Sequence, residues 1–255
     1  MEFYSSRRIR FLFINMTELV FSEDSYLKTI DAKITKIEGN AIITNRTIFY
    51  AESGGQPGDS GEIRLHDQTL KIIDTKKGNT PNEVLHIVDG EFDRGLVGKD
   101  AELIIDWEKR YELMKMHTGC HILCGIIEAE ITGASVGFQK SRIDFDVDPN
   151  LLNKEELNQK IETIIKDDHQ IFLNEISGDE FKNNPQLVKS AVLSPPVINN
   201  KVRTVQIGTS DNIIDLQCCG GTHCLSTKEL GSVEIGKIEN KGKRNRRVNI
   251  RFKND

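Results

Sequence analysis

Two pairs of metal-binding residue types are the features of this sequence best suited to chemistry. His117 and His121 fall in a stretch of helical periodicity, where a spacing of four residues places both imidazoles on one helix face. Cys219 and His223 have the same spacing and enclose a double glycine, which favours a tight turn over a helix interior. Imidazole and thiolate form a borderline-soft donor set that zinc usually occupies. The sequence therefore predicts one Zn²⁺ per chain, held by these four side chains.

The spacing leaves the kind of zinc site open. A structural site is closed by four protein ligands, whereas a catalytic site keeps one position for water or substrate. A pair of core histidines without metal is the alternative for His117 and His121 taken alone.

The five cysteines, an odd number grouped in two short segments, are unsuited to a disulfide framework. They indicate a reducing compartment, so we expect a cytoplasmic protein. Cys120 and Cys124 lie on the apolar stripe of the predicted helix and are expected to fill core space. Cys218 and Cys224 flank the second ligand pair, and Cys218 is a competitor for the role of Cys219.

The composition of the 255 residues, 37% hydrophobic and 29% charged, is typical of a soluble globular protein. No apolar run approaches the roughly 18 residues that cross a bilayer, so no membrane contact is expected. Residues 1–15 combine three arginines with a short apolar stretch and are interpreted as a leader or an over-extended start. The sequence carries no signal of oligomeric state.

The elements that must position the zinc ligands divide into two predicted domains. Residues 16–104 favour short strands separated by Gly, Asn and Asp, which predicts a small β-barrel. The expected strands are Ile30–Ile37, Ala41–Thr44, Thr47–Tyr50, Leu70–Asp74 and Glu83–Val88. Lys99–Asp106 is expected only to lead into the first helix.

Residues 105–255 predict an α+β domain with helices packed on an antiparallel sheet. The first helix is expected from Trp107 to about Glu130, ended by Thr132-Gly133, and a second is expected to open at Asp148-Pro149-Asn150. A strand is expected around Arg142–Phe145, and five more strands follow the helices: Ile171–Ile176, Lys201–Ile207, Asn212–Gln217, Ser232–Ile238 and Val248–Phe252.

Five motifs spread along this chain resemble one known family. The sequences HTGCH at 117–121, SRIDF at 141–145 and QCCGGTH at 217–223 are similar to the editing domain of alanyl-tRNA synthetases and to its freestanding relatives, the AlaX proteins. SGGQPGDSG at 53–61 resembles the glycine-rich motif of the β-barrel that precedes that domain, and TKELG at 227–231 matches as well. Two departures are Cys218, which stands where the family often has proline, and Cys224, which directly follows His223.

The resemblance implies a hydrolase that removes wrongly attached amino acids from tRNA. The expected substrate is alanine tRNA mischarged with serine, with glycine as a further candidate. The chain has no room for a synthetase core, so it would act in trans, as in the medium-sized AlaX class. The resemblance also assigns the zinc ligands to His117, His121, Cys219 and His223.

Three polar residues are candidates to recognise the serine hydroxyl: Thr118, Ser135 and Gln139. A buried hydrogen-bond partner would reject alanine, which cannot satisfy that partner. The hydroxyl of Thr118 could instead bond its own helix backbone. Gly54, Gly55 and Gln56 resemble the tripeptide with which peptide release factors cleave a tRNA ester, and the alternative is a plain glycine turn.

The net charge of −5 argues against a surface that coats nucleic acid, but basic residues gather near the C-terminus. Lys243, Arg244, Arg246 and Arg247, in a loop expected at Lys241–Arg247, are predicted to hold the tRNA backbone. A solvated surface loop is the alternative. Arg142 and Asp144 could contact substrate or form a structural ion pair.

Two other functions remain open at this point. One is an editing domain like that of threonyl-tRNA synthetases, acting on a different mischarged tRNA. The other is a non-catalytic RNA-binding module that zinc stabilises.

Overall fold

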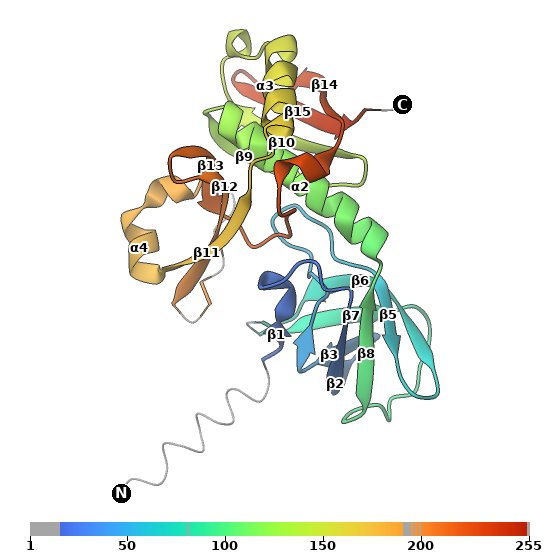
Figure 1. Ribbon diagram of the computed structural model, residues 1–255. Coiled ribbons are helices and arrows are strands. Elements are labelled where there is room, and N and C mark those ends of the chain that lie inside the picture. The colour runs from blue at the N-terminus through green and yellow to red at the C-terminus, as the bar shows by residue number, and fades with distance from the viewer. Residues whose placement is uncertain (1–15, 81, 191–194, 196, 199, 254–255) are drawn as a thin grey trace, which may run out of the picture. The chain divides into compact units, whose positions relative to one another are not determined.

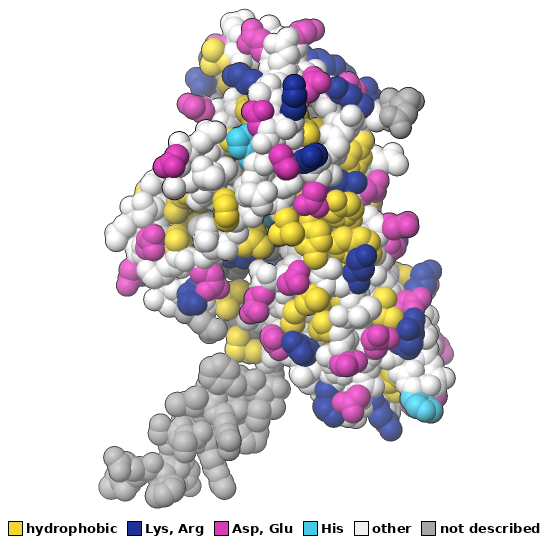
Figure 2. Space-filling view, in the orientation of Figure 1, with side chains coloured by type: hydrophobic (Ala, Val, Ile, Leu, Met, Phe, Trp, Pro, Cys, Tyr) yellow, Lys and Arg dark blue, Asp and Glu magenta, His cyan; other side chains and the backbone are white. Residues whose placement is uncertain are grey.

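The computed structural model describes residues 16–80, 82–190, 195, 197–198 and 200–253 (Figure 1, Figure 2). The leader expected at residues 1–15 lies outside the described residues. The chain forms two compact units, one comprising the residues up to Ser53 together with Pro57–Arg110, and the other comprising Gly54–Gln56 with Tyr111–Asp255.

The first unit is built around a closed barrel of six strands, each antiparallel to its neighbours. Around the barrel the order is β2 (Thr29–Glu38), β3 (Ala41–Thr44), β7 (Val84–Val88), β6 (Thr69–Lys77), β5 (Gly61–Arg64) and β8 (Asp100–Ile105). Inward positions alternate with exposed ones and carry Ile34, Ile42, Ile63, Ile72 and Leu103 into one core. The short strands β1 (Glu18–Leu19) and β4 (Arg46–Thr47) pair beside the turn η1 (Val20–Ser22).

The strand expected at Thr47–Tyr50 is wrong beyond Thr47. Residues 48–50 are buried, but the backbone donors of Phe49 and Tyr50 go to side chains instead of a neighbouring strand. The N–H of Phe49 donates to Thr47 Oγ1, and the N–H of Tyr50 donates to Asp59 Oδ2. The sequence also missed β5 and β8. The segment taken as a lead to the helix is therefore the strand that closes the barrel between β2 and β5.

A buried ion pair fixes the second half of the glycine-rich motif within the first unit. Arg110 is fully buried, and its guanidinium donates to both carboxylate oxygens of Asp59. It also donates to the carbonyls of Ser25 (2.9 Å) and Ile48 (2.6 Å). Because every partner of this charge is an acceptor, its desolvation is compensated and the loop is held in one conformation.

The second unit contains two antiparallel sheets. The four-stranded sheet has the order β14 (Val233–Asn240), β15 (Asn245–Phe252), β10 (Lys140–Asp146) and β9 (Glu130–Ser135). The three-stranded sheet has the order β11 (Ile171–Ser177), β12 (Lys201–Thr209) and β13 (Asn212–Cys218). The described elements of this unit also include the helices α3 (Lys154–Lys166) and α4 (Gly178–Asn183) and the short 3₁₀ helices η2 (Pro149–Leu151), η3 (Pro185–Leu187) and η4 (Thr227–Leu230).

Helix α2 (Trp107–Ile126) contacts both sheets at glycines. A Cβ on Gly119 would lie 3.0 Å from Ile250 Cδ1 of β15, and one on Gly125 would lie 2.4 Å from the carbonyl oxygen of Ile214 in β13. The apolar stripe expected from the sequence is confirmed, since Leu113, Met116, Cys120, Leu123, Cys124 and Ile127 are all buried. These close contacts fix the rotation of α2 about its own axis and its distance from each sheet. Helix α2 carries two of the candidate ligands.

Two expected helix boundaries are wrong. Helix α2 ends at Ile126, because residues 130–135 pair with β10 and Thr132-Gly133 lies inside β9. Helix α3 begins at Lys154, since the Asn153 side chain accepts from the N–H groups of Glu155 and Glu156 and caps it there. Pro149 begins only the short turn η2. Helix α3 then packs on β14 and η4.

The expected architecture is confirmed at the level of a mixed α+β chain with a closed barrel, antiparallel sheets and few helices. None of the described helices has both the length and the apolar character that a membrane crossing requires.

Candidate metal centre

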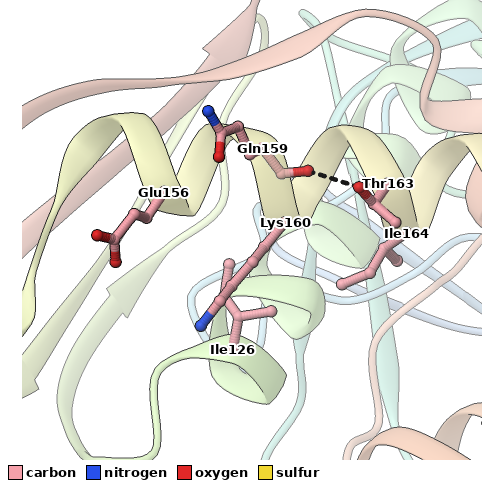
Figure 3. Close-up of a pocket in the computed structure, with 6 residues that line it drawn as sticks. All are labelled: Ile126, Glu156, Gln159, Lys160, Thr163 and Ile164. Carbon is pink, nitrogen blue, oxygen red and sulfur yellow. Dashed lines mark hydrogen bonds between the residues drawn. The ribbon is translucent and has the colours of Figure 1, made fainter.

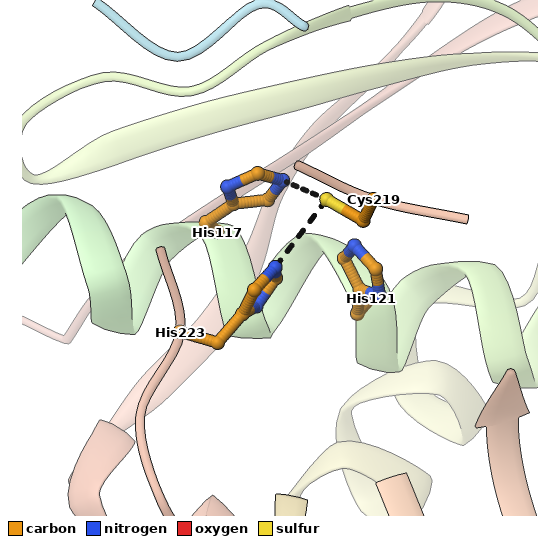
Figure 4. Close-up of side chains that lie close together, drawn as sticks. All are labelled: His117, His121, Cys219 and His223. Carbon is orange, nitrogen blue, oxygen red and sulfur yellow. Dashed lines mark hydrogen bonds between the residues drawn. The ribbon is translucent and has the colours of Figure 1, made fainter. Parts of the chain in front are cut away.

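The four predicted ligands come together in the second unit (Figure 4). Helix α2 supplies His117 and His121, and the loop after β13 supplies Cys219 and His223. Their ligand atoms all lie within 4.8 Å of one another. Cys219 Sγ is 3.6 Å from His117 Nε2 and 3.4 Å from His223 Nε2. Three nitrogens and one sulfur at this separation could hold a single metal ion.

The double-glycine loop allows this approach. A Cβ on Gly221 would lie 2.1 Å from His117 Cε1, so no other residue fits there without displacing the ligand. The N–H of Gly221 points to Cys219 Sγ at 3.4 Å. Arg203 donates to the carbonyls of Cys219 (3.1 Å) and Gly221 (2.7 Å) and secures the loop from β12.

A buried carboxylate orients His121. Asp215 of β13 is 1% exposed, and its Oδ2 lies 2.8 Å from His121 Nδ1. Gln217 donates to the same oxygen at 2.9 Å, and Lys189 donates to Oδ1 at 2.6 Å. A carboxylate only accepts, so Nδ1 of His121 carries a proton and its Nε2 is the nitrogen that a metal ion would bind.

The other two histidines also have partners at Nδ1. His117 Nδ1 lies 2.7 Å from Gln56 Oε1, and His223 Nδ1 lies 3.3 Å from Thr118 Oγ1. Every imidazole is therefore held from its Nδ1 side while its other nitrogen faces the cluster. This arrangement is typical of metal-ligating histidines.

Charge sharing within the cluster favours metal binding. Burial raises the pKa of the Cys219 thiol, but the neighbouring His117 and His121 outweigh it and hold that pKa well below its usual range. Burial lowers the pKa of His121, but the Cys219 thiolate and Asp215 outweigh it and raise that pKa to about 9. Burial, His117 and His121 lower the pKa of His223. Without metal the cluster thus pairs a thiolate with an imidazolium, and a cation can take the place of the proton.

The remaining thiols lie outside this cluster. Cys218 is partly exposed, and burial together with the Cys219 charge raises its pKa to about 11. Burial raises the pKa of Cys120 to about 12, and Cys224 is 1% exposed. A thiol that stays protonated is a poor metal ligand, so the geometry and the charge both favour Cys219 over Cys218.

The candidate substrate residues lie in different surroundings. Thr118 is fully buried, and its hydroxyl accepts from the N–H of Cys224 at 3.2 Å. Ser135 is half-buried at the end of β9, whereas Gln139 is exposed in the β9–β10 turn with a φ of 58°. Of the three, Ser135 combines partial burial with a hydroxyl that the cluster does not use.

The segment Gly54–Gln56 belongs to the second unit and lies against β9. Gly55 has a φ of 83°, and a Cβ there would lie 2.8 Å from the carbonyl oxygen of Ala134. Its own carbonyl accepts from the N–H of Val136 at 2.8 Å. Gly54 also has a positive φ, of 59°. The turn therefore needs glycine for its conformation and close approach, and it carries Gln56 to the cluster.

The basic residues expected to contact tRNA surround the β14–β15 turn: Lys243, Arg244, Arg246 and Arg247. Arg246 is buried and donates to the carbonyl of Gly242 and to Asn240 Oδ1, so it holds the turn together. Arg244 pairs with Asp146 and Arg247 with Asp144. The loop is shorter than expected, because β15 begins at Asn245. Arg142 also pairs with Asp144, which matches the structural alternative.

The sequence did not predict the residues that hold the metal ligands and their loop by hydrogen bonds. Asp215 and Gln217 are buried polar residues two apart on β13, which leads directly to Cys219. A pair of polar residues at alternate positions of this strand, directly before the loop that carries Cys219, was the sequence signal that could have predicted them. Lys189 and Arg203 gave no local signal, because only the folded chain brings them to the site.

A surface groove between α2 and α3 lies elsewhere in the second unit (Figure 3). Ile126, Glu156, Gln159, Lys160, Thr163 and Ile164 line it. It contains none of the four cluster residues, and the Thr163 hydroxyl donates to the Gln159 carbonyl of its own helix. We assign no chemistry to this groove.

Comparisons with known proteins identify sequences related to this chain. Residues 16–109 match the family of class II (A) tRNA synthetases, and residues 202–249 match the second additional domain of threonyl and alanyl tRNA synthetases. Both matches indicate the class of proteins related to tRNA synthetases.

Individual relatives identify the family within this class. The alanyl-tRNA editing protein AlaX-M of Methanosarcina mazei is 34% identical over 91% of this chain and 95% of its own length. AlaX-L of Pyrococcus horikoshii is 33% identical over 89% of this chain and 56% of its own length. Alanine–tRNA ligase of Pyrobaculum calidifontis is 34% identical, but the match covers 25% of that enzyme. The chain belongs to the AlaX family.

Proposed function

We propose that this protein is a zinc-dependent deacylase that acts in trans on alanine tRNA mischarged with serine, with glycine as a further candidate. The observation that carries the proposal is the convergence of three histidines and Cys219 within 4.8 Å in a chain whose relatives are alanyl-tRNA editing proteins. The donor set fits Zn²⁺, because three neutral imidazoles and one thiolate match its preferences in number and softness.

The exposure of the cluster supports a catalytic site over a closed structural one. The histidines are 7%, 4% and 2% exposed in chain order, whereas Cys219 and Gly220 are partly exposed. Solvent and substrate would therefore reach the cluster from the side of the Cys219–Gly220 turn. Bound zinc would supply a Lewis acid that polarises the ester or lowers the pKa of a water. The chain's own residues orient the imidazoles and keep Cys219 ionised.

Deacylation of the three charged forms of alanine tRNA tests the function. The wild type should hydrolyse the seryl form and spare the alanyl form. The glycyl form, which lacks the hydroxyl as alanine does, tests whether glycine is a substrate as well. A site that hydrogen-bonds the serine hydroxyl can discriminate by about 10⁴. Comparable hydrolysis of seryl and alanyl forms would contradict proofreading. An editing domain of the threonyl type would instead leave all three forms of alanine tRNA intact.

We propose Ser135 as the first candidate for recognising the hydroxyl. Thr118 is committed to the loop of Cys224, and Gln139 is exposed in a turn. Ser135→Ala should lower the preference for the seryl over the alanyl form, while Gln139→Ala serves as a control on the same hairpin. A preference unchanged in Ser135→Ala would place the pocket elsewhere.

Zinc removal separates the enzyme from a zinc-stabilised RNA-binding module. Chelation should abolish deacylation while the circular dichroism of the strands persists, because most of the second unit's core lies outside the cluster. Global unfolding on chelation would favour the structural module.

We propose that Lys243, Arg244 and Arg247 contribute to tRNA backbone binding, and we leave out Arg246, which is buried in the turn. Because Arg244 and Arg247 pair with aspartates, each should contribute less than an unpaired cation. Neutralising the three should weaken binding of all tRNAs alike and flatten the salt dependence of affinity. Lys182→Gln, on α4, is the matched control, and an unchanged salt slope would exclude the proposal.

A further inference from the structure

The side chain of Gln56 makes its contacts inside the candidate metal centre. It is 0% exposed and ends the Gly54–Gln56 segment. Gln56 Oε1 accepts from the N–H of Thr222 at 3.2 Å and lies 2.7 Å from His117 Nδ1. Gln56 Nε2 donates to Thr222 Oγ1 at 2.9 Å. Thr222 lies in the loop between the cluster residues Cys219 and His223.

These contacts define the tautomer of His117. A backbone N–H can only donate, so the N–H of Thr222 requires the oxygen of the Gln56 amide on that side. His117 Nδ1 contacts the same oxygen, and it must therefore carry a proton, so the neutral ring that a metal ion would bind is the Nδ1–H tautomer. The lone pair of the ring then lies on Nε2, which faces Cys219 Sγ at 3.6 Å.

We propose that Gln56 is a positioning residue for the metal centre. It fixes the tautomer and ring orientation of His117, and through Thr222 it secures the loop that carries the other ligand pair. The proposal rests on the proposed function only in taking the cluster as a metal site. It gives the glycine-rich segment a role in building the centre.

The engagement of its amide argues against direct substrate contact by Gln56. The carbonyl oxygen already serves two donors, and one amide hydrogen is used by Thr222. A substrate would have to displace these partners and leave His117 without its acceptor. The free energy lost when the buried imidazole has no acceptor exceeds the free energy gained from one new hydrogen bond, because a buried group left unsatisfied carries its full desolvation penalty.

The test compares zinc affinity in four variants by competition with a chelator, without tRNA. Gln56→Leu removes the acceptor and should weaken zinc binding by about 10–100-fold. Gln56→Glu keeps an oxygen for both donors and should retain most of the affinity. Thr222→Val removes one contact and keeps the His117 acceptor, so its loss should be much smaller than that of Gln56→Leu. Gln206→Leu, a partly buried glutamine on β12 away from the cluster, is the matched control.

A spectroscopic measurement separates positioning from a loss of fold. Long-range ¹H–¹⁵N spectra of zinc-loaded protein should show a protected His117 Nδ1–H in the wild type and in Gln56→Glu. That signal should be lost or shifted in Gln56→Leu. Near-wild-type zinc affinity and an unchanged Nδ1–H signal in Gln56→Leu would overturn the proposal. If deacylation fell in that case, Gln56 would act on the substrate. These readouts need no substrate, so they are independent of whether the wild type edits alanine tRNA.

Discussion

Replacing Asp215 with asparagine should impair metal binding although the two side chains have the same shape. Asp215 faces donors on both sides, with His121 Nδ1 and Gln217 Nε2 at one oxygen and Lys189 Nζ at the other. Burial raises its pKa, but His121 and Lys189 outweigh burial and keep that pKa below its ordinary value, so the group is ionised at neutral pH. Asparagine has an oxygen on one side only. Either its amide opposes Lys189, or it opposes His121 and Gln217.

The magnitude follows from these contacts. Loss of an outer partner of a metal-ligating histidine costs about 10–100-fold in affinity, or about 1.4–2.7 kcal/mol. If the asparagine amide faces His121, the ring must move its proton to Nε2, and the metal side loses its lone pair. The metal-free protein should also lose about 2 kcal/mol of unfolding free energy, since a charged hydrogen bond becomes neutral.

The assay is chelator competition at pH 7 for the wild type, Asp215→Asn and Asp144→Asn. Asp144 is the matched control, because it is also buried and paired with two cations, Arg142 and Arg247, but it does not contact the cluster. Asp144→Asn should lower stability and leave zinc affinity unchanged. Equal zinc affinity in Asp215→Asn and wild type would refute the assignment of Asp215 as the partner that orients His121.

Three further outcomes are expected. Elemental analysis should give one zinc per chain, strongly reduced by Cys219→Ala and retained in Cys218→Ala; the reverse pattern would shift the ligand by one residue. Gly221→Ala should reduce zinc content severely, because its Cβ would lie 2.1 Å from His117 Cε1; full occupancy would show that the loop can move. Burial lowers the pKa of His86 in the barrel to about 4, so the unfolded chain takes up its proton first, and stability should fall by up to about 3 kcal/mol from pH 6.5 to 4. Urea unfolding at both pH values should show a smaller decline in His86→Gln, and an equal decline would exclude His86 as the cause.

The sequence by itself determined the features that depend on near neighbours. A spacing of four residues brings His117 and His121 together wherever a helix forms, and the double glycine before His223 gives a turn in any surroundings. The apolar stripe of α2 and most barrel strands follow from periodicity in the same way. These local rules were sufficient to select four residues that the structure places together.

Local rules were less reliable where a distant partner decides the outcome. Residues 48–50 have the composition of a strand, but the N–H of Tyr50 donates to the Asp59 carboxylate instead of to a neighbouring strand. The helical pattern extends the expected helix to about Glu130, yet α2 ends at Ile126 because residues 130–135 pair with β10. In both cases hydrogen bonds formed across the fold outweigh a propensity of a few tenths of a kcal/mol per residue.

Only the tertiary structure decided which residues support the ligands. Gln56 is 61 positions from His117, and Asp215 is 94 positions from His121. No pattern within either segment records these contacts, because the sheets and the glycine turns must form before the partners meet. The types of the metal ligands can therefore be predicted from the sequence. Their tautomers, orientation and charge depend on groups that only the folded chain brings within hydrogen-bond distance.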